Sequence, residues 1–260
     1  MRLFRNSTSA SLPLPPLELR RLVGPTKDDW YDNPDGALVF PIVPESAYES
    51  VFDFGCGCGR VARMLIQQRP QPDRYVGIDL HRGMVDWCEQ HLAPQAPHFE
   101  FHHHDVFNVG LNPGAGKARE LPFPVEDNAF SLVNATSVFT HLTQEQAPHY
   151  LREAARVLRP DGVLHATWFL FDRSDFPMLG PENGAIYVSY QDPTAAVVFE
   201  RDWLTRTVGE AGLTIYDVVP PPMRGYQWTL LMSPSRPGLR PMPLPVDTAP
   251  VRDGPLPGVA

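Results

Sequence analysis

The chain has 260 residues, of which 43% are hydrophobic and 20% are charged, a composition that fits one ordinary globular domain. A formal net charge of −8 and the absence of any basic run argue against a surface that binds nucleic acid. No stretch approaches the roughly 18 consecutive apolar residues of a membrane span, and the N-terminus lacks the apolar centre of a secretion signal. We therefore expect a cytoplasmic protein without a membrane span.

Proline-rich segments mark both ends of the chain. Residues 1–45 predict an N-terminal arm or cap with one short helix near 17–23, and residues 234–260 predict a disordered or loosely packed tail. Residues 46–233 between them alternate strand and helix signals and carry an insertion at about 172–199 on the substrate side. The last two strands of this region follow one another without a helix, which predicts an antiparallel pair.

The strand signals are, in chain order, "ESVFDFG", "RYVGIDL", "HFEFHHHDV", "FSLVNATSVF" and "GVLHATWFLF". Helices are expected between them: from Arg60 to about Gln68, over "RGMVDWCEQHL", and after a capping box formed by Thr143 and Gln146. Such alternation predicts a mostly parallel α/β sheet with helices on both faces. Ligands of these folds bind beyond the carboxyl ends of the strands, where each of the motifs below falls.

A glycine-rich turn follows the first of these strands, in "VFDFGCGCGR", with glycine at 55, 57 and 59. Glycines there allow positive φ and let a ligand approach the backbone. A dinucleotide-binding oxidoreductase would carry its third glycine at position 60, which is Arg60, and a phosphate-binding P-loop would need G-K-S/T. An ordinary tight turn remains the alternative interpretation.

The three cysteines, Cys56, Cys58 and Cys88, are too few for a disulfide framework, and no second C-x-C pair completes a zinc site. The histidines of "FHHHD" alternate between the two faces of a strand. We therefore predict no metal site and interpret the cysteines as small side chains of the turn.

Carboxylates end three consecutive strands, at Asp53, Asp79 and Asp105. A carboxylate at the end of the second strand can accept hydrogen bonds from both hydroxyls of a ribose. Asp79 can also be a helix N-cap, and Asp105 taken alone can be a solvated turn residue. Three acids at three strand ends, behind a glycine turn, favour one common site.

With these motifs the chain resembles the class I S-adenosylmethionine-dependent methyltransferases over roughly residues 46–232. The stretches "LPFPVEDNAFSLVNATSVFTHL" and "YLREAARVLRPDGVLHATWFL" are typical of the small-molecule members of that family. The resemblance implies a Rossmann-like, seven-stranded, mostly parallel sheet with one antiparallel strand, and S-adenosyl-L-methionine as the cofactor. The family often has Asp where this chain has Ser131, a departure that concerns packing more than cofactor binding.

The resemblance also assigns roles to particular positions. Asp53 would help to hold the methionine amino group, and the backbone around Gly55, Cys56, Gly57 and Gly59 would line the methionine portion. Asp79 would accept from the ribose, and Leu80 and Met84 would lie against the adenine. The remaining implied contacts are Asp105 and the Val106 amide at the adenine edge, and Thr136 and Ser137 near the sulfonium.

A small-molecule acceptor is expected, such as a sugar, a polyketide, a lipid or another secondary metabolite. The N/D-P-P-Y/F motif, which fits amide or nucleobase nitrogen targets of related enzymes, is replaced by "NATS", and this absence and the acidic charge both disfavour nucleic acid. Oxygen is the favoured target, and N- and C-methylation stay open. His141 is the candidate general base, and a histidine that only orders its loop is the alternative; mid-strand His165 is interpreted as a core residue. Aromatic residues of the arm and the insertion could form the acceptor pocket or the core: Trp30, Tyr31, Phe40, Phe176, Tyr187 and Tyr190.

Two other functions stay open at this level: a Rossmann-type oxidoreductase with a nucleotide cofactor, and a non-catalytic cofactor-binding protein. The oligomeric state cannot be predicted from these patterns.

Overall fold

The computed structural model describes residues 12–116 and 118–250, and the predictions that concern residues 1–11 and 251–260 lie outside the described residues. The α-helices are α1 Leu17–Val23, α2 Arg60–Gln67, α3 Arg82–His91, α4 Gln146–Val157 and α5 Arg201–Glu210. The strands are β1 Ser50–Phe54, β2 Arg74–Asp79, β3 Phe99–His103, β4 Phe130–Ala135, β5 Leu158–Phe171, β6 Ala185–Tyr187, β7 Val197–Glu200, β8 Leu213–Val219 and β9 Trp228–Pro234.

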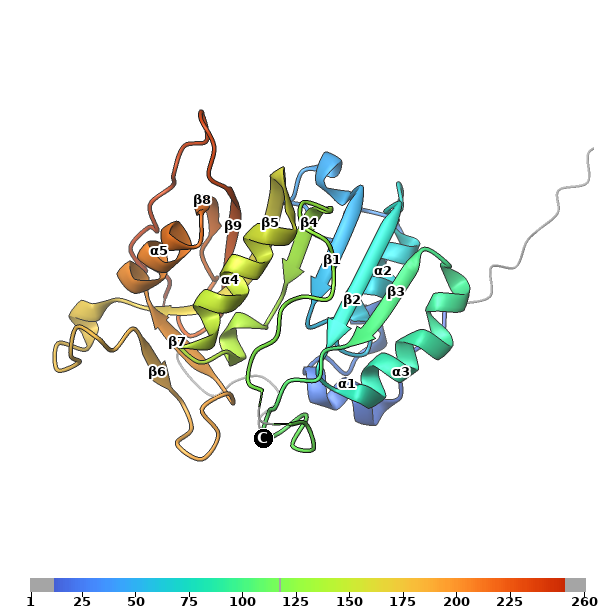
Figure 1. The fold of residues 1–260 in the computed structure, drawn as a ribbon, viewed down its shortest axis with the longest axis horizontal. Coiled ribbons are helices and arrows are strands. Elements are labelled where there is room, and N and C mark those ends of the chain that lie inside the picture. Colours follow the sequence, from blue (N-terminus) through green and yellow to red (C-terminus); the bar gives the residue numbers. More distant parts are fainter. Residues whose placement is uncertain (1–11, 117, 251–260) are drawn as a thin grey trace, which may run out of the picture.

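The sheet has the predicted parallel centre, in which β3, β2, β1, β4 and β5 are neighbours in that order (Figure 1). Strand β9 pairs antiparallel with β5, and β8 pairs antiparallel with β9. These seven strands confirm the expected sheet with one reversed strand. The insertion adds β6 and β7, and β7 pairs with the far end of the long β5, so the sheet branches there.

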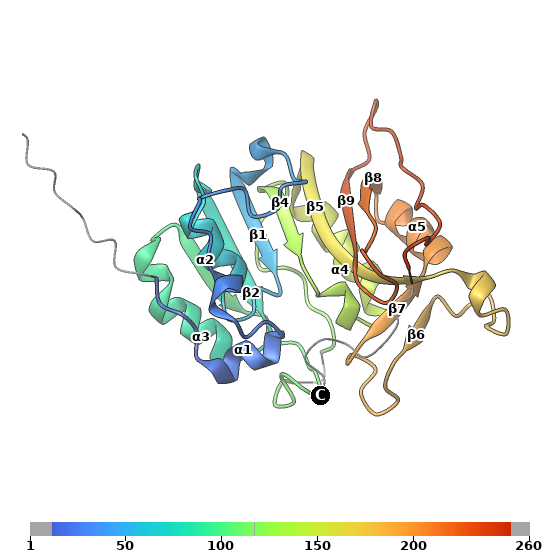
Figure 2. The same cartoon turned by 180° about the vertical axis from the view of Figure 1, so that it is seen from behind.

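Helices cover both faces of the sheet, as the alternation predicted (Figures 1 and 2). Both faces of β1 are apolar and therefore need cover. Phe52 and Phe54 on one face pack in a core with α4 and α5, and Val51 on the other face packs in a core with α2 and α3. The predicted capping box begins α4: the Thr143 N–H donates to Gln146 Oε1 at 2.9 Å and the Gln146 N–H donates to Thr143 Oγ1 at 3.3 Å.

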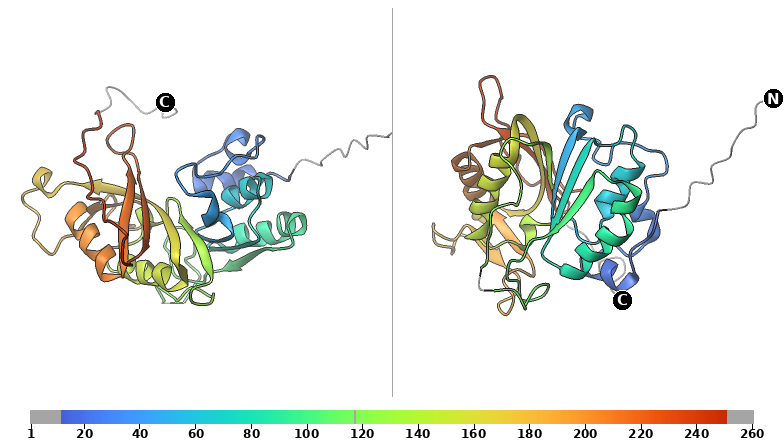
Figure 3. Two further views of the ribbon diagram at one scale, coloured as in Figure 1. Left: turned by 90° about the horizontal axis from the view of Figure 1, so that it is seen from above. Right: turned by 45° about the vertical axis from the view of Figure 1, so that its right-hand side comes forward.

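The N-terminal arm crosses the α2 side of the sheet (Figure 3). Buried Arg63 of α2 holds it, because its guanidinium donates to the carbonyl oxygens of Pro13 at 3.0 Å, Leu12 at 2.9 Å and Tyr31 at 2.5 Å and pairs with Asp32. Five donors in one rigid plane suit arginine to this task. The predicted short helix of the arm is α1, whose C-terminal end lies beside the glycine turn.

Residues 235–250 form neither helix nor strand, yet hydrogen bonds tie them to the domain. The Met242 N–H donates to the carbonyl oxygen of Ile215 in β8 at 2.8 Å, and the Arg224 guanidinium donates to the backbone oxygens of Asp247 at 2.9 Å and Ala249 at 3.1 Å. The described part of the tail is thus held against the domain. None of the helices in the described part of the chain has the length and apolarity needed to cross a bilayer.

Candidate functional site

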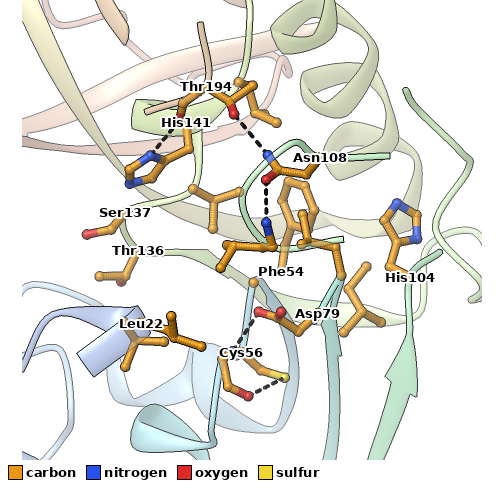
Figure 4. A pocket seen from close by; sticks show the side chains of 18 of the residues that line it. Leu22, Phe54, Cys56, Asp79, His104, Asn108, Thr136, Ser137, His141 and Thr194 are labelled. Atoms are coloured by element: carbon orange, nitrogen blue, oxygen red, sulfur yellow. Dashed lines mark hydrogen bonds between the residues drawn. The ribbon is translucent and has the colours of Figure 1, made fainter. Parts of the chain in front are cut away.

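A cavity of about 730 Å³ opens at the carboxyl ends of β1, β2 and β4 (Figure 4). This size lies within the range of about 300–1,000 Å³ that is typical of small-molecule and cofactor pockets. The sequence-predicted residues that line it are Asp53, Gly55, Cys56, Gly57, Asp79, Leu80, Val106, Thr136, Ser137 and His141. Residues predicted from separate motifs thus meet in one place.

The glycine-rich turn forms one wall of the cavity, with left-handed backbone at Gly55 (φ 77°) and Gly57 (φ 56°). A Cβ at Gly55 would overlap Val138 Cγ2, and one at Gly57 would lie 2.8 Å from Val23 Cγ1 of the arm. Side chains are therefore excluded here by backbone conformation and by space. Gly59 does not line the cavity, and Leu92 and Cys88 fill the space that its Cβ would occupy.

The amide groups of this turn are mostly used inside the protein. The Gly55 and Cys56 N–H groups donate to the carbonyl oxygen of Ile78, at 2.8 and 3.0 Å, and the Gly57 N–H donates to Asp79 Oδ2 at 2.8 Å. These bonds fix the shape of the wall. The turn therefore provides a close backbone surface more than a set of free donors.

All three cysteines are buried free thiols. Burial raises the pKa of Cys56 and of Cys88 well above the ordinary value, so both stay protonated at neutral pH. The sulfur atoms of both lie 3.7 Å from the Gly57 carbonyl oxygen, where they act as small packing groups. The described residues contain no group of three histidine, cysteine or acidic side chains that could hold a metal ion.

Asp79 links the end of β2 to the glycine turn. Its second oxygen, Oδ1, accepts from the His81 N–H at 2.8 Å, and burial raises the pKa of this carboxyl. The side chain that caps α3 is instead His81, whose Nδ1 accepts from the Met84 N–H at 3.2 Å. Asp79 therefore orders two turns and still lines the cavity with a carboxylate that has lone pairs to spare.

Met84 and Asp105, predicted to contact the adenine, are not in the cavity wall. Met84 is buried under the arm, where it packs with Tyr31 and Cys58. The Asp105 side chain is 59% exposed and accepts from Asn112 Nδ2 at 3.0 Å. Their predicted contacts with a cofactor stay predictions.

His141 is held by the insertion: its Nδ1 lies 2.9 Å from the backbone oxygen of Thr194, in the loop between β6 and β7 (Figure 4). Because a carbonyl oxygen can only accept, Nδ1 carries the hydrogen, and neutral His141 has an unprotonated Nε2. The Thr194 hydroxyl in turn accepts from Asn108 Nδ2 at 2.9 Å. This chain of contacts fixes the tautomer that a general base requires.

Ser137 has left-handed backbone, with φ 59°, in the cavity wall. Its N–H donates to Thr167 Oγ1 at 2.7 Å, and its hydroxyl donates to Gln227 Oε1 at 3.0 Å. Non-glycine residues in this conformation concentrate at functional sites.

The aromatic residues considered for the acceptor pocket do not line this cavity. Tyr190 is fully exposed and Trp30 is 58% exposed, whereas Tyr31 is buried and Phe40 stacks on His165 with 4.1 Å between ring centroids. The wall instead includes residues that the sequence analysis missed, namely Leu22, Asn108, Tyr150, Asp192, Thr194 and Gln227.

Comparison with known proteins supports the resemblance to methyltransferases. Residues 51–162 match the family described as "Methyltransferase domain". An O-methyltransferase from neocarzinostatin biosynthesis, NcsB1, solved with S-adenosylmethionine and 2-hydroxy-5-methyl naphthoic acid, is 13% identical, with a TM-score of 0.50 over 74% of this chain and 51% of that one.

Two further solved structures are similar. A chain of a Haloferax volcanii complex that contains the Trm112 methyltransferase activator is 13% identical, with a TM-score of 0.50 over 76% of this chain and 86% of that one. The cyclase SpnF is 21% identical, with a TM-score of 0.44 over 65% of this chain and 52% of that one. The chain thus spans about half the length of NcsB1 and of SpnF.

Residues 51–162 thus match a methyltransferase domain, and the fold is that of the class I S-adenosylmethionine-dependent methyltransferases that the motifs resemble. S-adenosylmethionine is the cofactor of that class.

Proposed function

We propose that this chain transfers a methyl group from S-adenosylmethionine to a small-molecule acceptor, with a hydroxyl oxygen as the target. The observation that carries the proposal is the meeting of the glycine turn, Asp79 and His141 in one cavity. Sugars, polyketides, lipids and other secondary metabolites are the acceptor classes considered. A cytoplasmic location and the absence of nucleic acid among the partners remain predictions from composition.

The residues present suit this cofactor. Asp53 and Asp79 in the wall are complementary to a ligand that carries an ammonium and a sulfonium, and Asp79 has acceptor capacity left for ribose hydroxyls. Arg21 and Arg60 are also among the residues that line the cavity, and a guanidinium group suits a carboxylate. Gly55 and Gly57 contribute backbone to the same wall, and the neighbouring Val138 and Val23 leave no room for a Cβ at either position.

Bound there, the cofactor supplies an electrophilic methyl group on sulfur. The protein positions the acceptor in line with it. With the cofactor bound, His141 Nε2 would accept the hydroxyl proton as the acceptor oxygen bonds to the methyl carbon, whose bond to sulfur breaks to leave S-adenosylhomocysteine. The Thr194 carbonyl oxygen would stabilise the imidazolium through Nδ1–H. Thr136 and Ser137 lie in the same wall and are proposed to approach the sulfonium.

The first test is calorimetric titration with S-adenosylhomocysteine and, separately, with NADH. Binding of S-adenosylhomocysteine alone supports the proposal. Binding of NADH alone would establish the oxidoreductase alternative.

The second test follows transfer of isotopically labelled methyl groups to fractionated metabolite extracts. His141→Gln should abolish or strongly slow transfer to a hydroxyl acceptor while S-adenosylhomocysteine affinity is unchanged. Binding without transfer to any fraction would favour a non-catalytic cofactor-binding protein. Full turnover in His141→Gln would return this histidine to ordering its loop.

A further inference from the structure

A row of buried polar side chains crosses four adjacent strands beneath the cavity. Tyr75 of β2, Asp53 of β1, Asn134 of β4 and His165 of β5 are each at most 4% exposed. The Tyr75 hydroxyl donates to Asp53 Oδ2 at 2.6 Å, and Asn134 Nδ2 donates to Asp53 Oδ1, also at 2.6 Å. His165 Nδ1 lies 2.9 Å from Asn134 Oδ1. One hydrogen-bonded path thus joins the four strands.

The hydrogen bonds of this row all point toward Asp53. Asn134 turns its NH₂ group to the carboxylate, so its oxygen accepts, and it accepts both from His165 Nδ1–H and from the Thr136 hydroxyl at 2.8 Å. Successive hydrogen bonds that point the same way polarise each other and stabilise a negative charge on the final acceptor, which is Asp53. The row therefore favours an ionised Asp53.

The sheet is shaped to hold this row. Asp53 is opposite Asn134 in the β1–β4 register, and Asn134 is opposite His165 in the β4–β5 register. A Cβ at Gly77 would lie 2.8 Å from the Tyr75 hydroxyl oxygen, so glycine at that position leaves room for the phenol to reach Asp53. Phe40 of the arm stacks on His165 and closes the other end.

Several groups besides the row act on the Asp53 carboxyl. Burial raises its pKa to about 6, against the lowering effect of the bonds from Tyr75 and Asn134. The Arg60 guanidinium lowers this pKa and the Asp79 carboxylate raises it. The nearby thiols of Cys56 and Cys88 are protonated and carry no charge at neutral pH.

We propose that Tyr75 and His165 are positioning residues, which act from the two ends of the row to keep Asp53 ionised and oriented in the cavity wall for a cationic cofactor. The inference rests on the proposed function, in which the bound molecule carries an ammonium group. It assigns a role in binding to a tyrosine and a histidine that are otherwise ordinary buried residues. Neither lines the cavity, so both act through Asp53 and Asn134.

The first experiment removes one hydroxyl, in Tyr75→Phe. The ring keeps its stacking on Phe99, at 4.6 Å between centroids, so the packing is preserved. Loss of a hydrogen bond to a charged group should raise the pKa of Asp53 by about one pH unit. Tyr48→Phe is the matched control, because its buried hydroxyl bonds only the backbone of Phe40.

Two measurements are made on each variant. Carbon NMR of the aspartate carboxyls in the ligand-free protein, assigned with Asp53→Asn, gives the pKa of Asp53 directly. Calorimetry with S-adenosylhomocysteine between pH 5 and 8.5 should show affinity lost below an inflection that moves upward by the same amount in Tyr75→Phe only. An unchanged Asp53 titration in Tyr75→Phe, or an equal change in Tyr48→Phe, would overturn the proposal.

The second experiment compares His165→Asn with His165→Leu. Asparagine can place its Nδ2 where His165 has Nδ1 and so keep the donor to Asn134, while leucine fills more of the volume under Phe40 without a donor. The proposal requires severalfold weaker S-adenosylhomocysteine binding in His165→Leu and recovery in His165→Asn. If packing alone mattered, leucine would be the better replacement, and that order would overturn the role of His165.

These experiments separate the present inference from the proposed function. An Asp53 titration that shifts as expected, in a protein that binds no S-adenosylhomocysteine at any pH, would confirm the action of the row on Asp53 and refute the proposed cofactor. Binding of S-adenosylhomocysteine with the same pH dependence in all variants would refute the row and leave the cofactor in place.

Discussion

Replacement of Asp79 by asparagine tests the junction between the glycine turn and β2. Its carboxylate accepts from two backbone N–H groups, those of Gly57 and His81, both at 2.8 Å. Hydrogen bonds to a charged group contribute about 1.5–3 kcal/mol each. Asparagine keeps one acceptor oxygen and turns an NH₂ group against the other N–H, so one bond is lost. We expect the free energy of unfolding to fall by about 2 kcal/mol.

Asp79→Asn should also weaken cofactor binding if the carboxylate accepts from two ribose hydroxyls. Loss of one such bond, about 2 kcal/mol, corresponds to roughly thirtyfold weaker affinity for S-adenosylhomocysteine. Urea unfolding and calorimetry measure the two effects on the same preparation. Asp105→Asn is the control for stability, because its exposed carboxylate should change the free energy of unfolding by less than about 0.5 kcal/mol.

Unchanged stability in Asp79→Asn would contradict the two backbone bonds, and unchanged affinity would contradict the ribose contact. A loss of affinity in Asp105→Asn, at unchanged stability, would establish the adenine contact that the sequence predicts, although Asp105 does not line the cavity.

Three other measurements probe the described geometry. Ser137→Gly should be more stable to urea than Ser137→Ala by about 1 kcal/mol, since only glycine adopts φ near 59° without strain; equal stability would contradict the left-handed backbone. Burial lowers the pKa of His104 and of His165 to about 4, so the stability from keeping each neutral, about 3 kcal/mol, is present above pH 6.5 and lost as the pH falls toward 4. Asp53, whose pKa is raised to about 6, becomes protonated over the same pH range and adds about 3 kcal/mol of stability, which offsets only one of the two histidines. The urea midpoint should therefore still decline as the pH falls, and a midpoint that does not change with pH would contradict the buried neutral histidines. Gly55→Ala should lower the melting temperature and abolish S-adenosylhomocysteine binding, because a Cβ at this position overlaps a neighbouring side chain; retained binding would show that the turn can move.

The fold could be predicted where local patterns repeat. Each long strand carries its own apolar run and the helices between them carry their own apolar spacing, so a parallel sheet with helices on both faces could be predicted. Strands β6 and β7 were missed, because "AIY" and "VVFE" are too short to give a periodic signal within a proline-punctuated insertion. Strand β7 is placed by its pairing with the end of β5, and this long-range contact leaves no signal in the local sequence of β7.

The cavity wall could be predicted for residues at or just beyond the ends of β1, β2 and β4, and not for those that distant loops bring to it. Asp53 and Asp79 are placed by the strands that precede them, so their convergence follows from topology. Thr194 and Gln227 reach the cavity from segments more than fifty residues beyond His141. Nothing in their local sequence indicates that approach. Tyr190 also lies outside this cavity, and an aromatic residue in a loop does not show which way the loop folds.

Because Arg63 of α2 binds the N-terminal arm, the arm and position 63 can be exchanged between related proteins only together. One guanidinium on α2 serves acceptors at Leu12, Pro13, Tyr31 and Asp32, and lysine has neither the fork nor the number of donors to replace it. An N-terminal arm of this type, moved onto a related domain, would therefore dock only if that domain carries arginine at the position of Arg63. In chimeras that exchange residues 12–32 without matching position 63, the N-terminal arm should no longer dock, even when every residue of the cavity wall is retained.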